Sequence, residues 1–220
     1  MGYVFPFRIK EAIMSRVKVF LSAVLAGMCI GFGGLVFLML DNKIVGAALF
    51  TIGLFVICTF GFHLFTGKVC YVFQNDAQYA INLPIIWVGN LIGTELVAGI
   101  SALTRNAYDL VEKAKVLCQI KLKDDLLSLF FLGVLCNIFI YIAVDGFGNN
   151  THELGKYLSL FFGVMVFILA GTEHCVADMF YFWMGGAWSV DAILRILVIT
   201  AGNAVGGCGF CMLRRLVKQE

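Results

Sequence analysis

The stretch GFHLFTGK at residues 61–68 decides the fold of this chain. It lies within a mostly apolar segment from Ile44 to Asn82, far longer than the roughly 20 residues that one helix needs to cross a bilayer. Its glycines, histidine and lysine would break a transmembrane helix at mid-membrane. Backbone groups freed by such a break cost several kcal/mol each in lipid, so they must be buried in protein or line a cavity. The stretch therefore predicts a broken helix beside an internal pathway.

A second break of the same kind lies in the other half of the chain. The stretch AGTEHCVAD at residues 170–178 interrupts an apolar segment over residues 157–190. It places two acids and a histidine at a similar depth in the membrane. Two broken spans that both need shelter from lipid predict one pathway between them.

The two halves of the sequence are internal repeats. A shift of 110 residues aligns Gly61 with Gly171, and the motif GNLIG at residues 89–93 recurs as GNAVG at residues 202–206. Each half holds three crossings, an odd number, so the second half must be inserted upside down relative to the first. This inverted-repeat plan is typical of transporters and channels, which place their selective site near the midplane between the broken helices.

Composition assigns the whole chain to a membrane. Of its 220 residues, 61% are hydrophobic and 14% are charged, and the mean hydropathy is +0.93. A water-soluble domain needs far less apolar sequence. We expect an all-α integral membrane protein of six transmembrane helices, as two inverted three-helix repeats with broken second and fifth spans. The uncharged runs that mark the crossings are Val19–Leu40, Ile44–Gly67, Ala77–Thr94, Leu126–Val144, Tyr157–Thr172 and Ile196–Leu213.

The chain is interpreted as a single membrane domain over residues 1–220. Its expected parts are a cytoplasmic amphipathic N-terminal segment (1–18, with a short helix over Phe5–Val17), a first repeat (19–104), a polar connection (105–123), a second repeat (124–213) and a cytoplasmic tail (214–220). Basic residues next to the first and last spans favour a cytoplasmic location for both termini. We therefore expect a multi-pass protein of the plasma membrane.

Charge, cysteine and histidine patterns argue against several functions. A net charge of +2 is too small to indicate nucleic-acid binding. The eight cysteines fall mostly in apolar runs, where a thiol packs as a small apolar side chain. The main alternative to transport is a membrane-embedded, metal-dependent enzyme that uses His174, Glu173 and Asp178. Three histidines in three separate regions give no metal-ligand pair, so we expect no enzyme, no metal and no cofactor. A non-transporting scaffold is a third possibility.

Five motifs, in the expected spans and order, resemble those of the formate/nitrite transporter family, which includes formate, nitrite and hydrosulfide channels. The resemblance covers the whole chain. The motifs are Leu64-Phe65-Thr66-Gly67 in the second span, Gly89-Asn90 in the third, Asn137 in the fourth, Gly171–Ala177 in the fifth and Gly202-Asn203 in the sixth.

The resemblance implies an aquaporin-like protomer, assembled as a homopentamer in which each subunit has its own pore. Thr66 then lies between the halves of the second span and faces His174 across the pore, with Asn137 as a third pore residue. Lys18 and Lys121 match basic residues of the inner and outer vestibules. The apolar constrictions are assigned to Phe50, Leu54, Leu64, Phe65, Ile140 and Phe167. Structural roles fall to Glu173, Lys68, Asp178, Asn90 and Asn203.

These residue types suit a filter for weak acids. A bare anion in a narrow apolar passage loses its hydration at a large cost, whereas a neutral acid loses much less. Histidine, with an ordinary pKa of about 6.5, is the side chain that changes charge near neutral pH. His174 could therefore donate a hydrogen bond or a proton to a passing anion. His174 and Glu173 could instead only tie down their own loop.

Two positions depart from the family pattern by gaining a charge. Lys68 stands where relatives carry a small polar residue, and Asp178 stands where they carry asparagine. The shift of 110 residues makes these positions equivalent. Since charges at this depth are usually paired, we expect a buried salt bridge between Lys68 and Asp178, the alternative being that each reaches a different surface.

The sequence leaves the transported anion open. Formate, nitrite, hydrosulfide, acetate and lactate are all small, singly charged and conjugate to weak acids. No residue of this chain would hydrogen-bond one of them to the exclusion of another. Passive conduction and proton-coupled transport also both remain open.

Overall fold

The computed structural model describes residues 16–218, and residues 1–15 and 219–220 lie outside the described part. The amphipathic helix expected over Phe5–Val17 lies almost entirely outside it. Nine α-helices and one 3₁₀ turn follow one another in the described residues. They are α1 (Arg16–Met39), α2 (Lys43–Phe60), α3 (Phe65–Val69), η2 (Val72–Gln74), α4 (Ala77–Ala102), α5 (Ala107–Lys123), α6 (Leu126–Asn149), α7 (Glu153–Leu169), α8 (Cys175–Met184) and α9 (Val190–Lys218).

The helices confirm the six expected spans and the two breaks. The second span divides into α2 and α3, and the fifth divides into α7 and α8. Helices α1, α2, α4, α6 and α9 are each long and apolar enough to cross a membrane. The third and sixth spans extend beyond the expected limits, since α4 continues to Ala102 and α9 covers residues 190–218. The polar connection expected over residues 105–123 forms the helix α5.

Polar caps fix where three of the spans begin. The Asn42 side chain accepts hydrogen bonds from the backbone N–H groups of Ile44 and Val45 at the start of α2. Asp76 and Asp125 cap α4 and α6 in the same way. Such caps satisfy amide groups that the first turn of a helix leaves unpaired. The spans therefore start at polar residues in the connections between them.

Both breaks end in the same glycine turn. Gly61 follows α2 with φ of 73°, and Gly171 follows α7 with φ of 68°, in the left-handed region that favours glycine. In each turn the next residue donates its N–H five positions back, from Phe62 to the carbonyl of Ile57 and from Thr172 to that of Phe167. The sequence repeat is thus reproduced in the local backbone.

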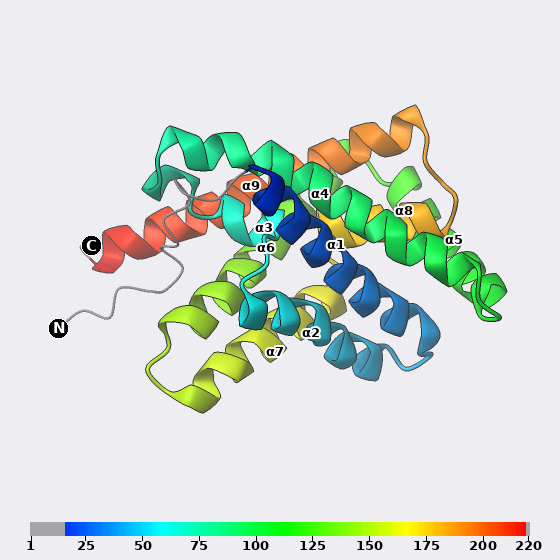
Figure 1. Cartoon of the computed structure of the whole chain (residues 1–220), viewed down its shortest axis with the longest axis horizontal. Helices are drawn as coiled ribbons and strands as arrows, with labels where there is room; N and C mark the ends of the chain where they lie inside the picture. The colour runs from blue at the N-terminus through cyan, green and yellow to red at the C-terminus, as the bar shows by residue number, and fades with distance from the viewer. Residues whose placement is uncertain (1–15, 219–220) are drawn as a thin grey trace.

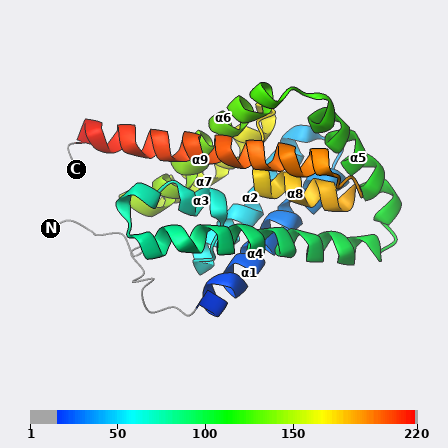
Figure 2. The ribbon, with the colours of Figure 1, turned by 90° about the horizontal axis from the view of Figure 1, so that it is seen from above.

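The long helices pack as two equivalent pairs, α1 with α4 and α6 with α9. Helices α2 and α7 lie side by side at another edge of the protomer (Figure 1). Seen from above, α4 and α9 run along the molecule, and the half-helices α3 and α8 lie between them on either side of the centre (Figure 2). Each half-helix is therefore enclosed by full-length helices rather than left facing lipid.

Glycines allow the paired helices to approach closely. A Cβ atom at Gly93 of α4 would overlap the backbone of Val24 and Met28 in α1. In the second repeat, a Cβ atom at Gly206 of α9 would overlap the backbone of Val134 in α6. Small residues at helix interfaces are the usual means of close packing in membranes. The GNLIG and GNAVG motifs therefore mark contact surfaces as well as the repeat.

We predict that Gly93→Ala will destabilise the protein whereas Gly99→Ala, in the same helix, will not. The added methyl group at Gly93 meets α1 backbone, which cannot rotate away, while a Cβ at Gly99 meets no atom within 4 Å. Overpacking of this kind costs about 1–3 kcal/mol. Thermal unfolding in detergent, monitored by size-exclusion chromatography, measures the difference. Equal unfolding midpoints for the two variants would contradict the packing described.

Candidate functional site

The two half-helices meet through one hydrogen bond between their first turns. Thr66 lies in the first turn of α3, and His174 is the residue that precedes α8. Thr66 Oγ1 lies 2.9 Å from His174 Nε2, and both side chains are buried. The two residues assigned to the pore from the sequence, 108 positions apart, are thus in direct contact.

The hydrogen bonds of His174 fix which ring nitrogen carries the proton. Nδ1 accepts a hydrogen bond from the backbone N–H of Ala177 at 3.1 Å, so it caps α8 and holds no proton. A neutral imidazole has one donor and one acceptor nitrogen. Nε2 is therefore protonated and donates to Thr66 Oγ1. The ring also stacks on Phe167, with centroids 5.6 Å apart, so it is fixed on its face as well as at both nitrogens.

Asn90 of α4 holds the break in the second span. Its Oδ1 accepts from the backbone N–H of Phe65 at 2.8 Å. Its Nδ2 donates to the carbonyl of Ala23 at 2.7 Å and to that of His63 at 3.0 Å. One buried amide thus pairs backbone groups on both sides of the break and ties them to α1.

Asn203 of α9 does the same for the fifth span. Its Oδ1 accepts from the N–H of Cys175 at 3.0 Å, and its Nδ2 donates to the carbonyls of Gly133 at 2.8 Å and Glu173 at 2.9 Å. Each backbone partner is the repeat equivalent of a partner of Asn90. The equivalent pairs are Phe65 and Cys175, Ala23 and Gly133, and His63 and Glu173.

Asn137 of α6 supports α3 rather than facing open space. Its Nδ2 donates to the carbonyl of Thr66 at 3.1 Å and lies 3.6 Å from Cys70 Sγ. Within residues 16–218, its buried Oδ1 has no hydrogen-bond partner. Asn137 therefore positions Thr66 and leaves one acceptor uncommitted beside it.

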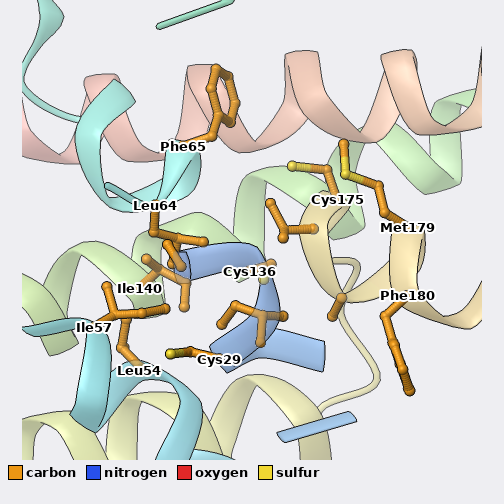
Figure 3. Close-up of a cluster of buried hydrophobic side chains, with 14 of the residues drawn as sticks. Cys29, Leu54, Ile57, Leu64, Phe65, Cys136, Ile140, Cys175, Met179 and Phe180 are labelled. Atoms are coloured by element: carbon orange, nitrogen blue, oxygen red, sulfur yellow. The ribbon is translucent and has the colours of Figure 1, made fainter. Parts of the chain in front are cut away.

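Two groups of apolar side chains lie near the Thr66–His174 contact. Figure 3 shows the first group, in which Leu54 of α2, Leu64 just before α3 and Ile140 of α6 gather together. In the second group, the rings of Phe50 and Phe167 meet edge to face, with centroids 6.2 Å apart, and Phe167 also stacks on His174. All the predicted constriction residues are buried, including Phe65 of α3. The structure therefore gathers five of the six predicted constriction residues, all but Phe65, into two apolar groups.

A cavity of about 710 Å³ opens beside Leu54 and Leu64. Both leucines line it, so it leads directly to that constriction. Its charged lining residues are Lys68, Asp145, Arg214 and Arg215, with Arg214 Nη2 3.1 Å from Asp145 Oδ2. Sequence reasoning missed Asp145 and used the two arginines only as signs of orientation, because nothing in the local sequence shows that the ends of α6 and α9 meet.

The predicted ion pair between Lys68 and Asp178 is wrong. Asp178 Oδ1 lies 2.9 Å from Lys121 Nζ, and no ion pair among residues 16–218 joins it to Lys68. Lys68 instead lines the cavity on the α3 side. In an inverted repeat, equivalent half-helices start near the centre and run apart, so equivalent residues one turn from the centre lie on opposite sides of it (Figure 2).

Lys121 of α5, expected in the open outer vestibule, is only 8% exposed and binds two acids. Its ammonium contacts Glu173 Oε2 and Asp178 Oδ1 together. Burial alone would lower the pKa of Lys121, but the two carboxylates outweigh burial and hold that pKa above its ordinary value. Lys18, by contrast, is exposed near the start of α1.

No group of three or more His, Cys, Asp or Glu side chains within residues 16–218 could hold a metal ion. The polar side chains at the centre, Thr66, Asn90, Asn137, His174 and Asn203, instead offer hydrogen bonds from two broken helices inside an apolar surround. This arrangement matches a permeation pathway. The sequence profile of formate/nitrite transporters matches residues 8–217.

The chain belongs to the formate/nitrite transporter family. It is therefore a multi-pass membrane channel or transporter for small anions and not an enzyme. It is 28% identical over 213 residues to the nitrite transporter NirC of Escherichia coli K12, covering 86% of this chain and 79% of that protein. It is 29% identical over 234 residues to a probable formate transporter of Methanothermobacter thermautotrophicus, covering 88% and 85%.

Solved structures agree with the fold. A pentameric formate channel with formate bound superimposes with a TM-score of 0.78 at 25% identity, over 97% of this chain and all of that one. An ion channel of the same family superimposes with a TM-score of 0.85 at 25% identity, over 95% and 93%. The all-helical fold with broken spans, expected from the sequence, is confirmed.

We predict that Asn203→Leu will destabilise the protein strongly. The change leaves one N–H and two carbonyl groups unpaired in a buried region, and each orphaned group costs about 1–3 kcal/mol. Asn106→Leu is the control, since Asn106 is exposed and its side chain does not cap α5. Thermal unfolding in detergent distinguishes the two. An Asn203→Leu protein as stable as the control would rule out the supporting role.

Proposed function

We propose that this chain conducts small monovalent anions of weak acids, with formate and nitrite as the leading candidates, through a pore within each protomer. The observation that carries the proposal is the Thr66–His174 hydrogen bond between two broken helices, with two groups of apolar side chains near it. Similar proteins described as nitrite and formate transporters support the substrate class. They support no choice between those anions, and hydrosulfide, acetate and lactate belong in the same test.

The geometry suits partial neutralisation of the anion at the centre. His174 Nε2–H donates to the Thr66 oxygen, so the hydroxyl hydrogen of Thr66 can be donated to an anion that enters. The positive end of the α8 helix dipole also points toward this contact. The apolar groups beyond penalise the bare anion, so the species that crosses them most easily is the neutral acid. In this tautomer His174 supplies its hydrogen bond through the Thr66 hydroxyl. It can supply a proton only after Nδ1 has taken one up and released the N–H of Ala177.

The orientation of the chain in the membrane is inferred from the basic residues at the ends of the first and last spans. We place both termini in the cytoplasm of the cell membrane, because Arg214 and Arg215 end the last span and Lys18 begins the first. The cavity lined by Lys68, Arg214 and Arg215 then opens toward the cytoplasm and attracts anions to the inner constriction. Lys18 adds positive charge on the same side.

The proposal is tested by anion flux into liposomes that hold the purified full-length chain. A panel of formate, nitrite, hydrosulfide, acetate and lactate is measured at an acid and a neutral pH. We expect flux of at least one anion, faster at the acid pH, and we expect His174→Asn to lose that acid stimulation. Asparagine still accepts hydrogen bonds as an N-cap, so α8 should persist without the ring.

The matched control is His152→Asn, at an exposed histidine that does not cap α7 through its side chain. It should keep the wild-type profile. Flux of none of the five anions would refute the transport function. An unchanged pH profile in folded His174→Asn would refute the role of the histidine while leaving transport intact.

We further propose a homopentamer. One similar solved structure is a pentameric channel, and large apolar side chains such as Leu21, Ile52 and Phe162 are exposed on the outer surface of the protomer. Native mass spectrometry of the detergent-purified protein should give five times the 24.2 kDa of one chain. A stable monomer or trimer would overturn this assembly without affecting the pore within each protomer.

A further inference from the structure

The Lys121–Glu173–Asp178 cluster has one more acid than base. Lys121 comes from α5, Glu173 from the loop before α8, and Asp178 from the first turn of α8. The three side chains are 10%, 7% and 3% exposed. With every group charged, the cluster would hold a net negative charge that is largely shielded from water.

The two carboxyl groups are close neighbours because they bind the same ammonium. Each lies within hydrogen-bond reach of Lys121 Nζ, so they are at most about 6 Å apart. Carboxylates that share a buried site at such a distance do not both stay ionised easily. Asp178 Oδ2 gives a second reason to expect a bound proton, since this oxygen is buried and has no hydrogen-bond partner among residues 16–218. A proton would convert that oxygen, or its Glu173 neighbour, from an unpaired acceptor into a donor.

No other cation neutralises the cluster in the described part of the chain. Arg195 of α9 contacts the backbone of Lys121 but none of the cluster's carboxylates. Its guanidinium binds the carboxylate of Asp191 and the backbone carbonyls of Lys121 and Asp124. The remaining titratable groups that interact with Asp178 carry no positive charge. They are Cys118 of α5, Cys136 of α6, and Cys175 and Tyr181 of α8.

The other helices that pack on α8 are α3, α4 and α1. Helix α3 carries Lys68, which lines the cavity and forms no ion pair with Asp178 within residues 16–218. Helix α4 has one acid, Glu95, which is exposed, and its length carries no basic residue. Helix α1 has basic residues only at its start, Arg16 and Lys18, and both are exposed. Within residues 16–218, the excess negative charge therefore has no neutralising partner except a proton.

We propose that the Lys121–Glu173–Asp178 cluster binds one exchangeable proton at neutral pH, shared by the two carboxyl groups, and that the pore conducts best while this proton is bound. Proton binding converts one carboxylate to a carboxylic acid and makes the cluster neutral. Its release leaves a net negative charge next to His174, which repels an anion at the centre of the pore. Asp178 thus acts on the anion through the charge of the cluster and does not touch the anion itself.

The proton itself is observed by infrared spectroscopy of the full-length protein in lipid. We expect the carbonyl stretch of a protonated carboxylic acid at neutral pH, lost as the pH is raised, and absent from Asp178→Asn, in which Lys121 and Glu173 balance each other. Asp145→Asn is the matched control, because buried Asp145 pairs with Arg214 and needs no proton. It should keep the band. A wild-type protein without a pH-sensitive band, or Asp178→Asn with an unchanged one, would overturn the proposal.

The effect on conduction rests on the proposed transport function and is measured separately. In liposomes, Asp178→Asn should retain several-fold more of its acid-pH flux at alkaline pH than the wild type does, because it cannot acquire the negative charge. His174→Asn should instead lose flux at acid pH. Identical flux profiles for wild type and Asp178→Asn would refute the link to conduction. If the wild type transports no anion yet shows the band, the transport proposal fails and the proton site stands.

Discussion

The fold depends on satisfying the backbone where two membrane helices break. Lipid offers no hydrogen bonds, so the free N–H and carbonyl groups at each break must find partners within the protein. Asn90 and Asn203 supply those partners, each pairing one N–H and two carbonyl groups. An amide side chain is suited to this task because it has both an acceptor and two donors at its end. The breaks are stable only because a neighbouring helix brings such a group to them.

That requirement explains the glycines beside each asparagine. An asparagine side chain is short, so its helix must lie almost in contact with the broken span and with the helix behind it. Gly93 and Gly206 remove the side chains that would keep α4 from α1 and α9 from α6. The motifs GNLIG and GNAVG therefore have the same two effects in both repeats. Their glycines allow a close helix contact, and their asparagines form the hydrogen bonds that this contact makes possible.

The sequence was sufficient to predict the six spans, both breaks, the repeat and the facing positions of Thr66 and His174, because each has a local pattern or a family motif. The sequence was insufficient to predict which charged side chains pair with one another. Lys68 and Asp178 are equivalent by repeat, yet an inverted repeat separates equivalent positions along the pore, and Asp178 binds Lys121 instead. Lys121 lies far before Asp178 in the chain, on a helix that sequence reasoning treated as a connection. Pairing across such a separation depends on how α5 folds back onto α8, which no local pattern specifies.

The departures from repeat symmetry are where the function arises. The residue before α3 is Leu64 and the equivalent residue before α8 is His174, so the same structural position supplies an apolar constriction in one half and a polar contact in the other. A symmetric pair of leucines would close the passage to any anion, because nothing would replace its hydration. A symmetric pair of histidines would leave polar groups at both half-helix starts and remove the apolar barrier contributed by Leu64. One of each places a polar contact next to an apolar barrier, so an anion that has lost its hydration meets a hydrogen-bond donor beside the constriction.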